Sequence, residues 1–142
     1  MKNKAQSALL TGATLWCFSI IAAPLANLTW VYHFFSIICH QDPSRSWFIL
    51  GEPLPVCIRC ASVYFGFLAS LWLCLPGKVT WLRVSIVMTM AEFAIARFFV
   101  DSSVLRCLSG ILLGAAAAPF VQQGVEEMIR GRIARGEARA SL

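Results

Sequence analysis

Long apolar segments constrain this chain more than any other feature. Four of them occur, at about residues 8–38, 61–75, 81–100 and 104–121. Hydrophobic residues make up 58% of the chain and charged residues only 13%, and the mean hydropathy is +0.72. Soluble domains carry about 25% charged residues, and about 20 mostly apolar residues form one membrane-spanning helix. The composition therefore predicts an integral membrane protein.

The fold class that follows is all-α: an integral membrane four-helix bundle with a Cys/His-containing loop between helices 1 and 2. We expect a transmembrane domain over residues 1–121, with the loop at 39–60, and a basic amphipathic C-terminal tail over residues 122–142. The first apolar segment is too long for one straight span. It either kinks at Pro24 or places its last part, Asn27 to Ile38, above the bilayer.

Basic residues are unevenly distributed between the two sides of this topology. With both termini cytoplasmic, eight lie on the inner side: Lys2, Lys4, Lys78, Arg83, Arg130, Arg132, Arg135 and Arg139. Four lie on the outer side: Arg45, Arg59, Arg97 and Arg106. Cytoplasmic loops carry an excess of Lys and Arg. We therefore predict a multi-pass protein of the cell inner membrane, with cytoplasmic termini and the Cys/His loop facing outward.

The C-terminal tail supplies much of the net charge of +5. Each basic residue near an anionic membrane surface contributes about 1 kcal/mol of attraction. We expect the tail to contact anionic lipid headgroups of the bilayer, and we expect no nucleic-acid partner. No protein partner follows from the sequence.

The loop 39–60 interrupts the apolar segments with three cysteines and a histidine, namely Cys39, His40, Cys57 and Cys60. Three thiols and one imidazole form a complete tetrahedral ligand set for a soft divalent metal. The CxxC spacing of the last two cysteines suits two ligands on one ion. We therefore expect a metal site, with zinc as the metal. Cys39 and His40 are adjacent and tend to point apart, so one of them could lie outside the ligand shell.

The same cysteines allow two other interpretations. A CxxC pair at a helix start is typical of redox-active thiols, because the helix N-terminus and Arg59 both lower a thiol pKa. Four helices with such a pair resemble the bacterial inner-membrane disulfide oxidase that passes electrons to quinone. The other predicted outer loop, residues 101–103, lacks the second cysteine pair of such enzymes. A disulfide that only staples the loop is the third interpretation, and the sequence leaves open whether the chain is an enzyme.

Two sequence patterns predict the local structure of this loop. Asp42 before Pro43 is typical of a helix start, with an N-cap followed by proline at N1. We predict a short helix through Ser44 to Phe48 and a chain reversal at Gly51 to Pro53. This hairpin would bring the two ends of the loop together.

Charged residues within the apolar segments mark a second candidate site. A charge inside a bilayer costs roughly 2.5–3.5 kcal/mol, so such residues pair or face a wet cavity. Glu92 lies inside the third segment, and we expect it to pair with Arg106 of the fourth. Arg97 and Asp101 are four residues apart and could pair along one helix. The cluster is a structural ion pair, a protonated Glu92, or a polar pocket whose candidate catalytic residues are Glu92, Arg97 and Arg106.

Small residues predict close helix packing in the fourth segment. Gly110-x-x-x-Gly114 and the alanines that follow it give this helix a small-residue face. We expect this face to serve packing within the bundle rather than dimerisation.

The loop also carries a family resemblance. The string Cys39-His40-Gln41-x-Pro43-x-Arg45-Ser46, then Gly51, Pro55-Val56-Cys57-x-Arg59-Cys60 and Tyr64-x-Gly66, resembles the signature of a family of small bacterial and archaeal membrane proteins classified as a domain of unknown function. The resemblance covers about residues 34–114. It implies a polytopic membrane protein with a functional loop, and it implies no activity. It also matches Glu92 to an acidic position in the third helix and Arg106 to an arginine in the fourth.

Overall fold

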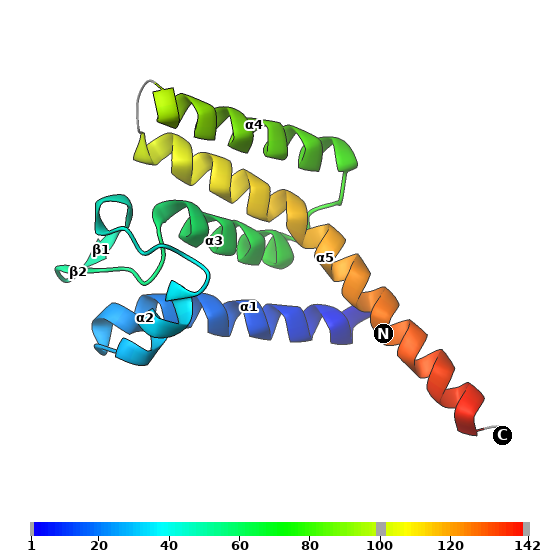
Figure 1. Ribbon diagram of the computed structural model, residues 1–142. Helices are drawn as coiled ribbons and strands as arrows, with labels where there is room; N and C mark the ends of the chain where they lie inside the picture. Colours follow the sequence, from blue (N-terminus) through cyan, green and yellow to red (C-terminus); the bar gives the residue numbers. More distant parts are fainter. Residues whose placement is uncertain (1, 99–101, 141–142) are drawn as a thin grey trace.

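A computed structural model describes residues 2–98 and 102–140 of the chain, and Figure 1 shows their arrangement. The described part is all-α apart from one small hairpin, which confirms the predicted class. Its helices are α1 (Lys2–Leu25), α2 (Thr29–Ser36), α3 (Ile58–Leu73), α4 (Val79–Phe98) and α5 (Ser103–Ala140). A 3₁₀ helix, η1 (Pro43–Arg45), and two antiparallel strands, β1 (Phe48–Ile49) and β2 (Glu52–Pro53), lie between α2 and α3.

The four longer helices lie side by side in the order α1, α3, α5, α4 (Figure 1). Among the described residues, α1, α4 and α5 are long and apolar enough to cross a membrane. Helix α3 has 16 residues, or about 24 Å at 1.5 Å per residue, against a hydrocarbon thickness of about 30 Å. The described residues therefore contain three candidate spans and one shorter apolar helix, and the predicted bundle of four spanning helices stays a prediction.

The first apolar segment is broken into two helices. Helix α1 ends at Leu25, directly after Pro24, and Asn27 takes a left-handed conformation with φ of 51°. The separate helix α2 buries Val31 and Phe35. The prediction that this segment is not one straight span is confirmed. The break follows from the proline, which supplies no backbone N–H to the last turn of α1.

Glycines bring α3 and α5 into backbone contact. A Cβ atom added to Gly66 would collide with the carbonyl oxygen of Ile111, and one added to Gly114 would collide with that of Val63. One added to Gly110 would lie 2.9 Å from the carbonyl oxygen of Arg59. The prediction that the Gly110-x-x-x-Gly114 face serves internal packing is confirmed.

The predicted fourth span and the tail form one helix. Helix α5 has 38 residues and continues through Pro119 without a break at the expected boundary near residue 121. Its length is about 57 Å at 1.5 Å per residue, so it extends well past the other helices (Figure 1). The side chains of residues 132–142 lie outside what the structure describes.

We predict that Gly114→Ala destabilises the protein by about 1–3 kcal/mol, because the added methyl group forces α3 away from α5. Gly124→Ala is the matched control, since nothing lies within 4 Å of a Cβ atom there. Removing a glycine from a helix interior otherwise stabilises by up to about 1 kcal/mol. Thermal unfolding in detergent should therefore move in opposite directions for the two variants. Equal shifts would contradict the packing described here.

Candidate metal centre and buried charge cluster

A capped turn and a tight hairpin form the loop. The side chain of Asp42 accepts a hydrogen bond from the backbone N–H of Ser44 at 3.0 Å, as predicted for an N-cap, and Pro43 is at N1. The helix that follows is shorter than predicted and ends at Arg45, because the next residues pair as strands. The chain reverses at Leu50 and Gly51, whose φ angles are 53° and 90°. Two successive positive φ angles are typical of a type I′ hairpin turn.

Gln41 ties the two ends of the loop together. Its side-chain amide donates to the carbonyl oxygen of Tyr32 at 2.6 Å and to that of Pro55 at 2.9 Å. The hydroxyl of Tyr32 donates to the carbonyl oxygen of Pro53 at 2.6 Å. These bonds hold the chain before Cys57 beside α2. Sequence reasoning missed this role, since a polar residue beside a cysteine carries no signal for two long-range bonds.

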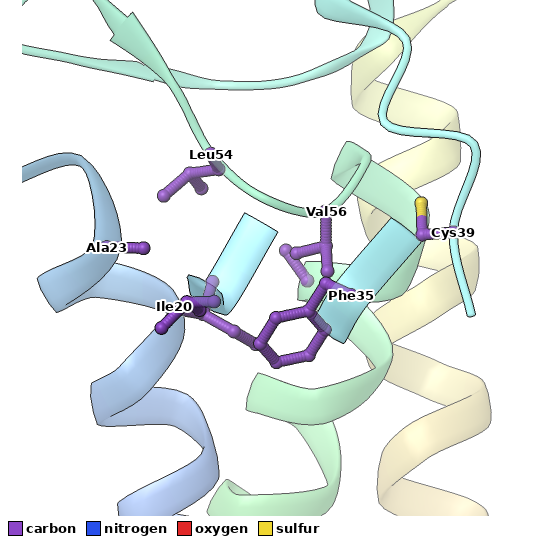
Figure 2. Close-up of a cluster of buried hydrophobic side chains, with 8 residues drawn as sticks. Ile20, Ala23, Phe35, Cys39, Leu54 and Val56 are labelled. Atoms are coloured by element: carbon purple, nitrogen blue, oxygen red, sulfur yellow. The ribbon is translucent and has the colours of Figure 1, made fainter. Parts of the chain in front are cut away.

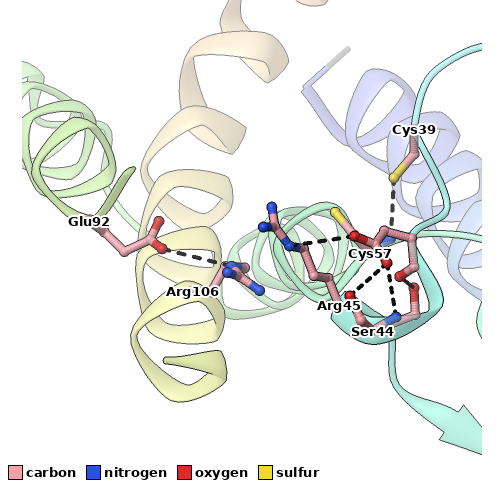
Figure 3. Close-up of polar contacts among 8 residues, drawn as sticks. Cys39, Ser44, Arg45, Cys57, Glu92 and Arg106 are labelled. Carbon is pink, nitrogen blue, oxygen red and sulfur yellow. Dashed lines mark hydrogen bonds and ion pairs between the residues drawn. The ribbon is translucent and has the colours of Figure 1, made fainter. Parts of the chain in front are cut away.

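Cys39, Cys57 and Cys60 form a compact group of thiols. Their sulfur atoms all lie within 4.8 Å of one another, and all three are free thiols. Cys57 is the N-cap of α3, and its backbone N–H donates to the sulfur of Cys39 at 3.3 Å (Figure 3). Cys39 is only 6% exposed. The sequence prediction that the two ends of the loop meet is confirmed for these three residues.

A hydrophobic cluster holds Cys39 in place. Figure 2 shows this cysteine at the edge of a group of buried side chains from α1, α2 and the segment leading into α3. The other members are Ile20, Ala23, Val31, Phe35, Leu54, Val56 and Ala61. These side chains pack closely around Cys39, and close packing limits how far its thiol can move.

His40 does not join the thiols. Its side chain is exposed, and the group of close sulfur atoms does not include it. The backbone at Cys39 and His40 is not helical. The structure therefore brings together three of the four predicted ligands.

Hydrogen bonding makes Cys57 the acidic thiol of the group. The side chain of Cys60 bonds to it and lowers the pKa of Cys57 to about 5. Backbone N–H groups at the start of α3 and the thiol of Cys39 lower this pKa further, whereas burial raises it. Because the lowered pKa lies below neutral pH, Cys57 is a thiolate at pH 7 and becomes a thiol only as the pH falls through about 5. A thiolate is both the nucleophilic form and the metal-binding form of cysteine.

A buried charge cluster lies beside the thiols. The Nε atom of Arg106 lies 3.9 Å from Oε1 of Glu92 (Figure 3), which confirms the predicted pair. The side chains of these two residues are 6% and 7% exposed. Oε1 accepts no hydrogen bond within the described structure, so this contact is purely electrostatic.

Arg59 is the member that the sequence analysis missed. Its guanidinium hydrogen-bonds and pairs with Oε2 of Glu92, and it also lies over the ring of Phe93 at 5.5 Å from the centroid. We had assigned Arg59 only an effect on the thiols. An arginine one residue inside an apolar helix was the available signal, because such a charge needs a partner.

The side chains of two predicted members of the charge cluster lie outside the described part of the structure. Arg97 lies on α4, but its side chain is not described, and Asp101 lies in the undescribed segment 99–101. Among the described residues, Glu92 pairs with Arg59 and with Arg106, and the polar pocket expected around it stays a prediction.

We predict that Glu92→Gln destabilises the protein by about 3–5 kcal/mol, because it leaves two arginines without their buried carboxylate. Glu52→Gln is the matched control, since Glu52 is exposed at the hairpin. Its unfolding midpoint in detergent should stay close to that of the wild type. An unchanged midpoint for Glu92→Gln would show that the cluster contributes no stability.

The comparisons with known proteins support the membrane class. The profile of a family described as "Predicted membrane protein (DUF2085)" matches residues 39–120. An uncharacterized protein of Methanocaldococcus jannaschii is 46% identical over 41 residues, which is 29% of this chain and 26% of that protein. The match thus spans about a quarter of that relative's length. No solved structure matches the chain significantly. Because the family profile covers more than half of the sequence, the chain belongs to the DUF2085 family of predicted membrane proteins.

Proposed function

We propose that this membrane protein binds one zinc ion through Cys39, Cys57 and Cys60, beside the Glu92 charge cluster. The observation that carries the proposal is the separation of the three sulfur atoms, all within 4.8 Å of one another. Thiolates are soft ligands and suit zinc. Zinc–sulfur bonds of about 2.3 Å in tetrahedral geometry put ligand sulfurs about 3.8 Å apart. The thiols therefore need to close by at most about 1 Å, which small side-chain rotations supply.

Hydrogen bonding also favours metal binding. Ligand atoms of metal sites are usually fixed by further bonds from the protein. The backbone N–H of Cys57 provides one such bond to the sulfur of Cys39. The thiolate form of Cys57 at neutral pH removes the need to displace a proton there.

Charge balance points the same way. Three thiolates around a divalent ion carry a net charge of −1. The neighbouring cluster has two arginines and one carboxylate, so Arg59 and Arg106 leave a net charge of +1 against Glu92. Arg59 lies between two of the proposed ligands in the chain. An excess positive charge there stabilises an anionic metal centre in surroundings of low dielectric constant.

The fourth ligand position decides what such a site can do. Structural zinc sites use four protein ligands, whereas catalytic sites use three and leave one position open. His40 was our expected fourth ligand, and its exposed position supports instead a site with three cysteines. Cys39, Cys57 and Cys60 would hold the ion, and zinc with an open position would supply Lewis-acid chemistry toward a substrate. Glu92 and Arg106 pair with each other, so we assign them a positioning role through Arg59.

We further infer the orientation in the membrane. Two of the four basic residues on the predicted outer side, Arg59 and Arg106, are neutralised in part by Glu92. A third, Arg45, lies 3.6 Å from Asp42. The positive-inside rule counts Lys and Arg rather than net charge, so these pairs add nothing to it. The excess of eight basic residues on the predicted inner side over four on the outer side favours cytoplasmic termini, an outward loop and an inner-membrane location. The basic end of α5 would then lie against anionic lipid headgroups.

A thiol–disulfide oxidoreductase is the second candidate. The lowered pKa of Cys57 favours it, because a thiolate at a helix N-terminus with a CxxC partner is typical of such enzymes. Oxidation of the Cys57 thiolate and the Cys60 thiol to a disulfide would release two electrons and one proton, and a quinone would take both electrons, that proton and a second proton from solvent to become a quinol. Cys39 is close enough to act as a third, resolving thiol.

Elemental analysis of the detergent-purified protein, with a thiol count on the same sample, tests the proposal. We expect about one zinc per chain and its loss in Cys39→Ser, Cys57→Ser and Cys60→Ser alike, because each removes one of three ligands. Cys74→Ser is the control, since Cys74 is exposed at the far end of α3. His40→Ala should keep the metal.

Other outcomes assign the thiols differently. No zinc, with Cys57 and Cys60 oxidised, would overturn the metal proposal in favour of the redox or staple roles. A mixed disulfide trapped with a partner by Cys60→Ser would select the redox enzyme, because a staple traps none. Loss of zinc in His40→Ala would restore His40 as a ligand.

A further inference from the structure

We infer that an acyl lipid is the ligand of this site, with one acyl chain in an apolar groove between α1 and α3 and its headgroup beside the cysteines. This inference rests on the proposed function and names its substrate class. The groove is lined by Gly12, Ala13, Trp16 and Cys17 of α1 and by Tyr64 and Phe67 of α3, among others. Its exposed lining atoms are all apolar. An apolar lining without polar groups selects a hydrocarbon chain.

One face of α3 connects the groove to the thiols. Cys60, Val63, Tyr64 and Phe67 follow the spacing i, i+3, i+4 and i+7, so they share one face. The last three line the groove. Tyr64 lies one turn from Cys60, about 6 Å along the helix axis. A chain that lies in the groove therefore ends directly below the cysteine group.

Aromatic rings close the end of the groove nearest the cysteines. The rings of Trp16 and Tyr64 meet edge to face, with 5.7 Å between their centroids. Both pack against the hydrophobic cluster that contains Cys39. A chain whose upper end lies at the level of these lining rings has its polar end at the loop, one helical turn from Cys60. Tryptophan and tyrosine are the side chains typical of the boundary between lipid tails and headgroups.

The size of the groove suits an acyl chain. Its volume is about 440 Å³, roughly 15 times the 30 Å³ that a water molecule occupies in the liquid. A methylene group is close to a water molecule in size, so the groove holds about as many carbons as an ordinary acyl chain. A long isoprenoid tail is several times larger.

The groove is continuous with the lipid-facing surface of α1. Leu15 and Phe18 are 64% and 66% exposed on this candidate span. Gly12 leaves the side of the helix open, because nothing lies within 4 Å of a Cβ atom there. A chain of a bilayer lipid can therefore enter sideways from the membrane.

Gly12→Leu tests the inference, because Gly12 lines the groove and a Cβ atom there has open space, so a leucine side chain would occupy the groove. Gly124→Leu is the matched control, since it also has open space around its Cβ position and lies on α5, away from the groove. Delipidated protein would be titrated with dipalmitoyl phosphatidylglycerol and measured by native mass spectrometry. We expect one tightly bound lipid in the wild type and in Gly124→Leu, and at least tenfold weaker binding in Gly12→Leu. Ala13→Leu should act like Gly12→Leu, and unfolding midpoints establish that each variant folds.

Cobalt(II) in place of zinc tests whether the headgroup reaches the metal. The phosphorus NMR signal of the bound lipid should broaden in the cobalt protein and stay sharp in Cys57→Ser. Equal binding by Gly12→Leu and wild type, or retention of an isoprenoid instead of a phospholipid, would overturn the inference. A bound lipid whose phosphorus signal has the same width in the cobalt and zinc proteins would also overturn the inference. Zinc measured on the same samples separates the two claims, because a wild type that binds lipid without metal contradicts only the proposed function.

Discussion

At Gly66 and Gly114 the backbones of α3 and α5 approach so closely that no side chain fits between them. Ser70 adds a hydrogen bond from its hydroxyl to the carbonyl oxygen of Ala115 at 2.8 Å. Since α3 is short, this contact fixes both its height and its rotation against the longer α5. The N-terminus of α3 carries Cys57, Arg59 and Cys60, so the same contact decides where two thiols and one buried charge lie.

The group of thiols and the buried charge cluster meet at the N-terminus of α3. On one side, Cys57 and Cys60 face Cys39, which the Gln41 hydrogen bonds and the hydrophobic cluster hold in reach. On the other side, Arg59 crosses to the carboxylate of Glu92, which Arg106 also contacts. The short helix thus couples the loop outside the candidate spans to charges inside them.

The sequence predicts well what depends on composition and local spacing. Apolar segment lengths place both ends of α4 and the start of α5 within a few residues, although α5 continues well beyond the end predicted for the fourth segment. The Asp42 cap and the small-residue face of α5 are both found. What depends on three-dimensional packing is harder to predict. The Arg59–Glu92 pair joins residues that are far apart in the chain. The hydrogen bonds of Gln41 need a positive φ angle at that residue, which is 50°, and no sequence pattern predicts it. The adjacency of Cys39 and His40 indicates that one of them could lie outside the group, but which of the two lies near the other thiols depends on the folded backbone.

The central claim is a zinc ion held by three cysteine thiolates, with its fourth position open. Zinc K-edge X-ray absorption of the purified protein tests it most directly, because it counts sulfur neighbours and lighter neighbours separately. The account predicts three sulfur atoms at about 2.3 Å and one oxygen or nitrogen at about 2.0–2.1 Å. A shell without sulfur, or one with four sulfur atoms that close the site, would contradict it.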